Sequence, residues 1–109
     1  MNNNFTVIWR DVEIGDFENT IPDMWYLEGD CKPNSTSEAQ AFTNLVNKFN
    51  AIFVMKDWRH GTRVLLKSKE KNDVLTHALI ISLNENKLLL RRVFKKEAIE
   101  QLLKNVKMI

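Results

Sequence analysis

The sequence predicts an α+β fold: a single mainly antiparallel sheet in the order βββαβ(β)ββα, with two helices packed on the sheet. Short stretches rich in β-branched and aromatic residues alternate between apolar and polar positions, as strands with one buried face do. Two longer segments, residues 37–49 and 95–106, instead repeat their apolar residues at helical spacing. The length of 109 residues fits a single α+β domain over residues 1–109.

The first two predicted strands form a hairpin. Phe5–Arg10 places its odd-numbered residues, which are apolar, on one face. Val12–Glu18 alternates again after Asp11, so the two stretches pair as neighbours. The segment at residues 21–23 contains Pro22 and predicts a turn, because proline fixes φ and donates no ladder hydrogen bond.

Met24–Asp30 reads as the third strand. Adjacent residues of a strand point to opposite faces, so the neighbouring aromatics Trp25 and Tyr26 are predicted to separate. Trp25 and Leu27 are expected in the core. Tyr26 and Glu28 are expected to face water or a partner.

The first predicted helix covers residues 37–49. Ser35 followed by Glu38 three residues later is typical of a capping box. The apolar stripe consists of Ala39, Phe42, Leu45, Val46 and Phe49. The next segment, Ala51–Lys56, is apolar but too short for a typical helix, and it is interpreted as a strand or as the chain's return to the sheet.

The second half predicts three strands and a helix. Arg63–Lys69 alternates as one strand, and Val74–Leu83 with Lys87–Phe94 forms the clearest hairpin. These last two stretches are apolar on both faces for part of their length, which predicts strands partly covered by helices. The helix at residues 95–106 has a predicted buried stripe of Ala98, Ile99, Leu102, Leu103 and Val106.

The composition favours a cytoplasmic protein without cofactors. The single cysteine, Cys31, allows no intramolecular disulfide, so nothing in the sequence indicates an oxidising compartment. No apolar run approaches the roughly 18 residues of a membrane span, and the start of the chain does not resemble a signal peptide. No metal site is expected, because the cysteine and the histidines lack short ligand spacing.

Two histidines define an alternative function, that of a small RNA-binding or RNA-cleaving protein. His60 and His77 could act as base and acid, and Arg59 and Arg63 could stabilise phosphate charge. This chemistry requires the side chains to converge in space. No nucleic-acid motif with diagnostic spacing accompanies them, and no nucleophile or phosphate-loop motif is present. The main expectation is therefore a non-enzymatic protein.

Charge is distributed unevenly along the chain. Residues 1–50 carry three Lys or Arg against eight Asp or Glu, net −5, whereas residues 51–109 carry thirteen against six, net +7. Either these charges neutralise each other across the sheet, or the acidic strands bind a basic protein partner. The partner-binding residues expected in the second case are Glu13, Asp16, Glu18, Tyr26, Glu28 and Asp30.

The chain resembles the small single-domain immunity proteins of bacterial toxin systems. The resemblance rests on the architecture and on two stretches, "PDMWYLEGD" (Pro22–Asp30) and "THALIISL" (Thr76–Leu83). It implies a protein that binds and neutralises a cognate toxin, in many cases a nuclease with a basic active site. The pI of about 8.8 departs from this pattern, because nuclease-neutralising immunity proteins are commonly acidic overall.

Overall fold

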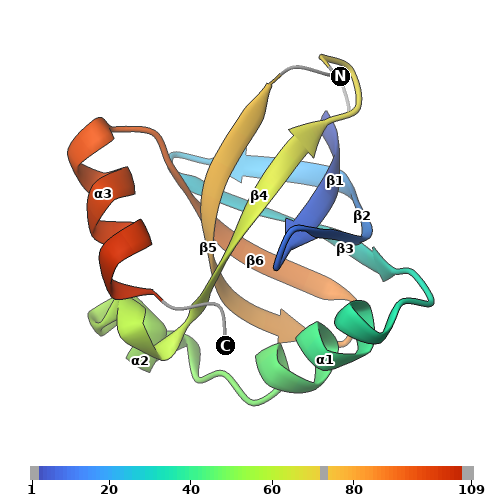
Figure 1. The fold of residues 1–109 in the computed structure, drawn as a ribbon, viewed down its shortest axis with the longest axis horizontal. Coiled ribbons are helices and arrows are strands. Elements are labelled where there is room, and N and C mark those ends of the chain that lie inside the picture. The colour runs from blue at the N-terminus through green and yellow to red at the C-terminus, as the bar shows by residue number, and fades with distance from the viewer. Residues whose placement is uncertain (1–2, 72–73, 107–109) are drawn as a thin grey trace.

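The chain forms a closed antiparallel barrel with short helices outside it (Figure 1). The computed structural model describes residues 3–71 and 74–106. The strands are β1 (Asn3–Trp9), β2 (Val12–Asp23), β3 (Tyr26–Pro33), β4 (Thr62–Ser68), β5 (Leu75–Asn84) and β6 (Lys87–Val93). The helices are α1 (Ser37–Val46), α2 (Ala51–Lys56) and α3 (Lys96–Asn105), with one 3₁₀ turn, η1 (Trp58–His60).

The prediction of an open sheet with two helices packed on it was wrong. The strand order is β1-β2-β3-β6-β5-β4, and the first and last members pair with each other, Phe5 opposite Ser68 and Ile8 opposite Leu65. Irregular pairing in β1–β2, β2–β3 and β5–β6 increases the local twist that closure requires. An open sheet and a barrel both bury one face of each strand, so alternation alone cannot distinguish them.

The barrel interior holds the larger of two hydrophobic cores. Trp9, Phe17 and Phe42 are its largest side chains, each at most 1% exposed. Trp9 meets Phe42 of α1 edge to face at 5.4 Å between ring centroids. The indole Nε1 of Trp9 donates a 2.9 Å hydrogen bond to Oγ1 of the buried Thr62. Helix α1 therefore closes one end of the barrel, as Figure 1 shows.

A second core lies outside the barrel, between the sheet and the helices α2 and α3. Leu79, Ile81 and Val93 of β5 and β6 pack there with Val54 of α2 and Leu102 of α3. This confirms the expectation that the last two strands are covered on both faces. None of the helices in the described part of the chain is long and apolar enough to cross a membrane.

Several local predictions are confirmed and others are wrong. The hairpin of β5 and β6, the faces of β1 and the two longer helices lie where the periodicity places them. The predicted turn at residues 21–23 is wrong, because β2 continues through Pro22, which pairs with Leu27. Trp25 was expected in the core, but it lies in the β2–β3 turn and is 45% exposed. Leu103 of α3 is also exposed rather than buried.

The segment predicted as a strand after α1 is the helix α2. Asn50 caps it, since its side-chain oxygen accepts hydrogen bonds from the backbone N–H groups of Ile52 and Phe53. Thr36, not Ser35, likewise caps α1 by accepting from the N–H of Ala39. Packing of Val54 against the second core offsets the short length of α2.

Candidate functional site

Three of the six residues predicted to bind a partner are neutralised within the chain. The ion pairs are Asp16–Lys69 (2.7 Å), Glu18–Lys32 (2.8 Å) and Asp30–Lys87 (2.6 Å). Asp30 also accepts a 3.0 Å hydrogen bond from Asn19, and the bonds from Asn19 and then Lys87 lower the pKa of this exposed carboxyl group. Two of these three ion pairs, Asp16–Lys69 and Asp30–Lys87, join the acidic first half of the chain to the basic second half.

The remaining three residues lie in two separate places. Glu13 borders a shallow hollow of about 320 Å³ together with Asp16 and Asn34. Tyr26 and Glu28 border a different hollow further along β3. The structure therefore does not bring the six predicted residues together into one surface.

The hollow beside Tyr26 is the strongest candidate for a binding site. It has a volume of about 410 Å³ and lies on the outer face of β2, β3 and β6, with one wall from α2. We refer to it as the acidic groove, which is lined by Ile21, Asp23, Tyr26, Glu28, Met55 and Leu89. Asp23 and Glu28 form no ion pair with any described residue, in contrast to Asp16 and Glu18 of β2.

Apolar side chains exposed to solvent surround the acidic groove. Ile21 is 69% exposed and Met24, in the adjoining turn, is 73% exposed. Met55 brings a third apolar group from α2. Contiguous exposed apolar groups next to unpaired charges are typical of protein-binding surfaces.

The β2–β3 turn holds Met24 in an unusual backbone conformation. Its φ is +57°, in the left-handed region that favours glycine, and a long side chain there costs stability. Nη2 of Arg92 donates to the Met24 carbonyl at 2.6 Å, and the Arg92 backbone N–H donates to the Trp25 carbonyl at 2.7 Å. The turn is therefore fixed to β6 in a conformation that presents two apolar side chains to solvent.

Tyr26 faces outward as the strand period predicts, but it is only partly exposed. Its side chain packs against the second core, and across the ladder it pairs with Arg91 of β6. Tyr26 therefore contributes a wall to the acidic groove, while Glu28 contributes an exposed carboxylate. A tyrosine already packed on one side loses little side-chain entropy when a partner covers it.

The residues of the RNA alternative do not converge. His77 pairs with Leu65 of β4, whereas His60 ends η1 and lines a hollow with Arg59 that does not include His77. Arg59 forms an ion pair with Asp57 at 2.8 Å. Nε of Arg63 donates to the Val106 carbonyl at 3.0 Å. No contact or hollow among the described residues joins the two histidines.

The single cysteine lies inside the barrel and is poorly suited to nucleophilic chemistry. Burial, with a smaller contribution from Asp16, raises the pKa of the Cys31 thiol to about 11. The thiol is therefore protonated at neutral pH. Within residues 3–71 and 74–106, no group of three or more histidine, cysteine or acidic side chains is placed to hold a metal ion.

Comparison with known proteins gives no relative: no protein-family model, curated protein or solved structure matches the chain.

Sequence reasoning missed most of the groove. Asp23 was assigned to a turn and Met55 to a strand, and nothing in the spacing indicates that β2 and α2 meet beside Leu89 of β6. One signal of an exposed apolar surface was present in the sequence. The stretch "MWY" at residues 24–26 has more large apolar side chains than a two-residue turn can bury.

Proposed function

We propose that the chain is a non-enzymatic protein-binding module that uses the acidic groove to hold a basic protein partner. The observation that carries the proposal is the pairing of two carboxylates, Asp23 and Glu28, with an apolar groove whose other walls include Ile21 and Leu89. Both carboxylates lack an ion-pair partner among the described residues, so their charge is available to a ligand.

The chemistry of the groove fits a lysine or arginine side chain. Such a side chain has an apolar stem and a charged end, so its stem can cover apolar walls while the end meets a carboxylate. Ile21, which lines the groove, and Met24, in the adjoining turn, would then contact apolar residues flanking the cation. This combination of a desolvated apolar contact and a charged pair is how protein interfaces obtain both affinity and orientation.

A narrower form of the proposal follows the resemblance to immunity proteins, which now rests on the stretches Pro22–Asp30 and Thr76–Leu83 rather than on the predicted open sheet. A toxin with a basic active site would supply the cationic side chains that the groove accepts. On this proposal the chain blocks the toxin by occupying that basic surface, and it contributes no catalytic group of its own.

The test is capture of a partner followed by kinetics on defined variants. The wild-type chain is used to isolate interacting proteins from its natural source, and each captured protein is then measured against Glu28→Lys and Glu100→Lys. Glu100, exposed on α3, provides the matched control because the same charge change occurs away from the groove. Glu28→Lys is expected to slow association about tenfold at low salt, with a smaller effect at high salt.

Two outcomes would contradict the proposal. One is a captured partner that binds Glu28→Lys and a Met24→Asp variant as fast and as tightly as wild type. The other is equal loss of binding in Glu28→Lys and Glu100→Lys, which would mean that only overall charge matters.

A further inference from the structure

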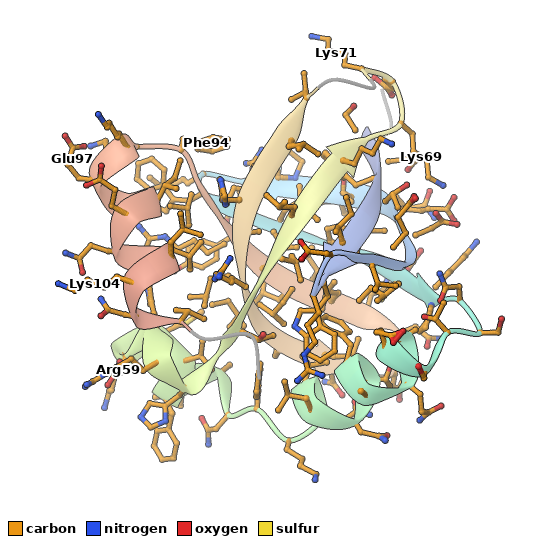
Figure 2. All side chains as sticks on the ribbon, viewed as in Figure 1. Arg59, Lys69, Lys71, Phe94, Glu97 and Lys104 are labelled. Atoms are coloured by element: carbon orange, nitrogen blue, oxygen red, sulfur yellow. The ribbon has the colours of Figure 1, made fainter. Side chains whose placement is uncertain are left out.

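A second pocket lies on the other side of the β2–β3 turn, where β6 leads into α3. It has a volume of about 200 Å³, and we refer to it as the α3 pocket, lined chiefly by Trp25, Arg91, Arg92, Phe94, Lys95 and Ala98. Figure 2 shows Phe94 where the chain leaves the barrel for α3. The pocket shares no lining residue with the acidic groove.

The walls and size of the α3 pocket suit one aromatic ring. Trp25 and Phe94 are 45% and 58% exposed, so neither ring is buried in a core and both can contact a ligand. A cavity of about 150 Å³ in another protein is enough to bind benzene. A volume of about 200 Å³ therefore accommodates one ring with a small substituent, with the two aromatic side chains available for stacking or edge contacts.

The charge around the α3 pocket is positive and unpaired. Arg91, Arg92 and Lys95 form no ion pair with a carboxylate among residues 3–71 and 74–106, and none of the described lining residues is acidic. In Figure 2 the nearby Glu97 projects from α3 away from the barrel. The first turn of α3, which no side chain caps, also holds Glu97, whose charge opposes the positive end of the helix dipole.

Arg92 is the best placed of these cations. It uses two of the five N–H donors of its guanidinium on the carbonyls of Met24 and Trp25, which fix its position at the turn. Its Cζ lies 5.4 Å from the Phe94 ring centroid. Burial lowers the pKa of Arg92, and no acidic side chain offsets that desolvation. The remaining donors of this fixed, planar group match a carboxylate well.

Arg91 adds a buried donor that is not used within the chain. Its Nε is buried without a hydrogen-bond partner among the described residues, while its Cζ lies 4.9 Å from the Trp58 ring centroid. A buried donor without an acceptor lowers stability. An anion close to this side chain would reduce that penalty through its charge.

We propose that the α3 pocket binds a small aromatic carboxylate. The ring lies against Trp25 and Phe94, and the carboxylate meets the guanidinium of Arg92 and the ammonium of Lys95. This inference goes beyond the proposed function, because it concerns a different ligand and residues outside the acidic groove. The same chemistry is offered by a free aromatic acid and by a peptide that ends in phenylalanine.

The test uses three probes that share one ring and differ in charge: phenylacetate, 2-phenylethanol and phenethylamine. Binding to the full chain is followed by shifts of backbone amide signals and of the Trp25 indole N–H signal in nuclear magnetic resonance. Phenylacetate is expected to bind with a dissociation constant in the millimolar range and to shift signals of residues 92–98. The neutral probe is expected to bind about tenfold more weakly, and the cation more weakly still.

Matched variants locate the site. Lys95→Gln is expected to weaken phenylacetate about threefold, whereas Lys96→Gln, one residue further and outside the pocket lining, leaves it unchanged. Ala98→Leu fills the pocket and is expected to abolish binding of all three probes. A peptide ending in phenylalanine, with a free or an amidated carboxyl group, then distinguishes the two sources of the ligand.

The outcomes that would overturn the proposal are equally specific. Absence of any phenylacetate shift in residues 92–98 at millimolar concentration rejects the site. Equal binding of phenylacetate and 2-phenylethanol rejects the role of the cations. If Lys95→Gln and Lys96→Gln weaken phenylacetate binding equally, the loss reflects the overall charge of the protein and not a contact in the α3 pocket. Because Lys95 is exposed, its variant tests the proposal even if Ala98→Leu does not fold.

Discussion

At the scale of single residues, Met24 has a backbone conformation and an exposure that do not favour the stability of the folded state. Met24 combines a left-handed φ of +57° with 73% exposure, so its side chain neither relieves the backbone nor fills a core. Strained positions of this kind concentrate at functional sites. Met24 lies with Trp25 in the turn that follows Asp23, a lining residue of the acidic groove, which is why we place it beside the proposed interface.

Replacing Met24 by glycine separates stability from binding. Glycine adopts positive φ without steric penalty, so Met24→Gly is expected to raise the free energy of unfolding by up to about 1 kcal/mol. Met24→Ala, which keeps a Cβ, is expected to leave stability nearly unchanged. Urea denaturation measures both. Both variants should weaken binding of a captured partner, and a Met24→Gly variant less stable than Met24→Ala would contradict this account of the turn.

The buried thiol predicts a defined alkaline loss of stability. Burial raises the pKa of Cys31 from 9.0 to about 11, so the folded state holds its proton more tightly than the unfolded state. The contribution of this group is therefore fully present below pH 9 and is lost as pH rises from 9 toward 11, up to about 3 kcal/mol. The difference in unfolding free energy between wild type and Cys31→Ala, measured from pH 7 to pH 11, should shrink over that interval. A constant difference would show that the thiolate is tolerated inside the barrel.

At the scale of elements, one glycine allows β2 and β3 to pair around an irregularity. A Cβ added at Gly29 would lie 2.6 Å from the Glu18 carbonyl oxygen and 2.9 Å from Cγ2 of Thr20. The pairing of β2 with β3 shifts register between Glu18 and Ile21, next to this point. The close approach of the two strands at the irregularity therefore depends on the missing side chain.

Gly29→Ala is accordingly expected to destabilise the chain by about 1–3 kcal/mol, since the obstacle is backbone that cannot rotate away. Chemical denaturation gives the value. Glu28→Ala, the neighbouring exposed position on the same strand, is the control and should change stability by less than about 0.5 kcal/mol. A Gly29→Ala variant as stable as this control would show that β2 moves freely at the irregularity.

The sequence predicted helix or strand correctly for elements long enough to repeat their hydrophobic pattern. The hairpin of β5 and β6 and the helices α1 and α3 span seven to ten residues each, and their patterns were interpreted correctly. Ala51–Lys56 has six residues, fewer than two helical turns, so periodicity could not separate helix from strand. The capping oxygen of Asn50, which accepts from the backbone N–H of Ile52, decided the outcome locally.

At the scale of the whole molecule, the sheet separates two cores. Ile80 faces the barrel interior and belongs to the first core, whereas Leu102 of α3 packs on the outer face in the second. Side chains without shared partners contribute independently to stability. The two cores should therefore respond to substitution as separate units.

A double-mutant cycle tests this independence. Ile80→Val is expected to cost about 0.5–1.5 kcal/mol and Leu102→Ala about 2–5 kcal/mol, with the pair additive within about 0.5 kcal/mol. Equilibrium denaturation supplies the four free energies. As a control, Ile80→Val combined with Leu90→Ala joins partners that face each other inside the barrel and should deviate further from additivity. Equal deviation in both cycles would show that strain passes through the sheet.

The closure of the sheet into a barrel and the set of residues that line the groove could not be predicted from the sequence, and the physical reason is the same for both. Both depend on contacts between distant segments, such as Phe5 with Ser68, or Met55 with Leu89 across the groove. Sequence patterns report which face of an element is buried, but not which element buries it. The charge asymmetry was visible in the sequence. Only the fold shows that Asp16, Glu18 and Asp30 form ion pairs with lysines, whereas Asp23 and Glu28 do not.

Closure of the barrel also limits how a partner can dock. Each of β1 to β6 has a hydrogen-bonded neighbour on both sides, so no described strand presents a wholly free edge to which an extended peptide could add a strand. The same geometry removes the usual template for edge-to-edge aggregation. On the proposed function, a partner would therefore contact side chains on the outer surface, and a change of partner specificity would require substitutions there.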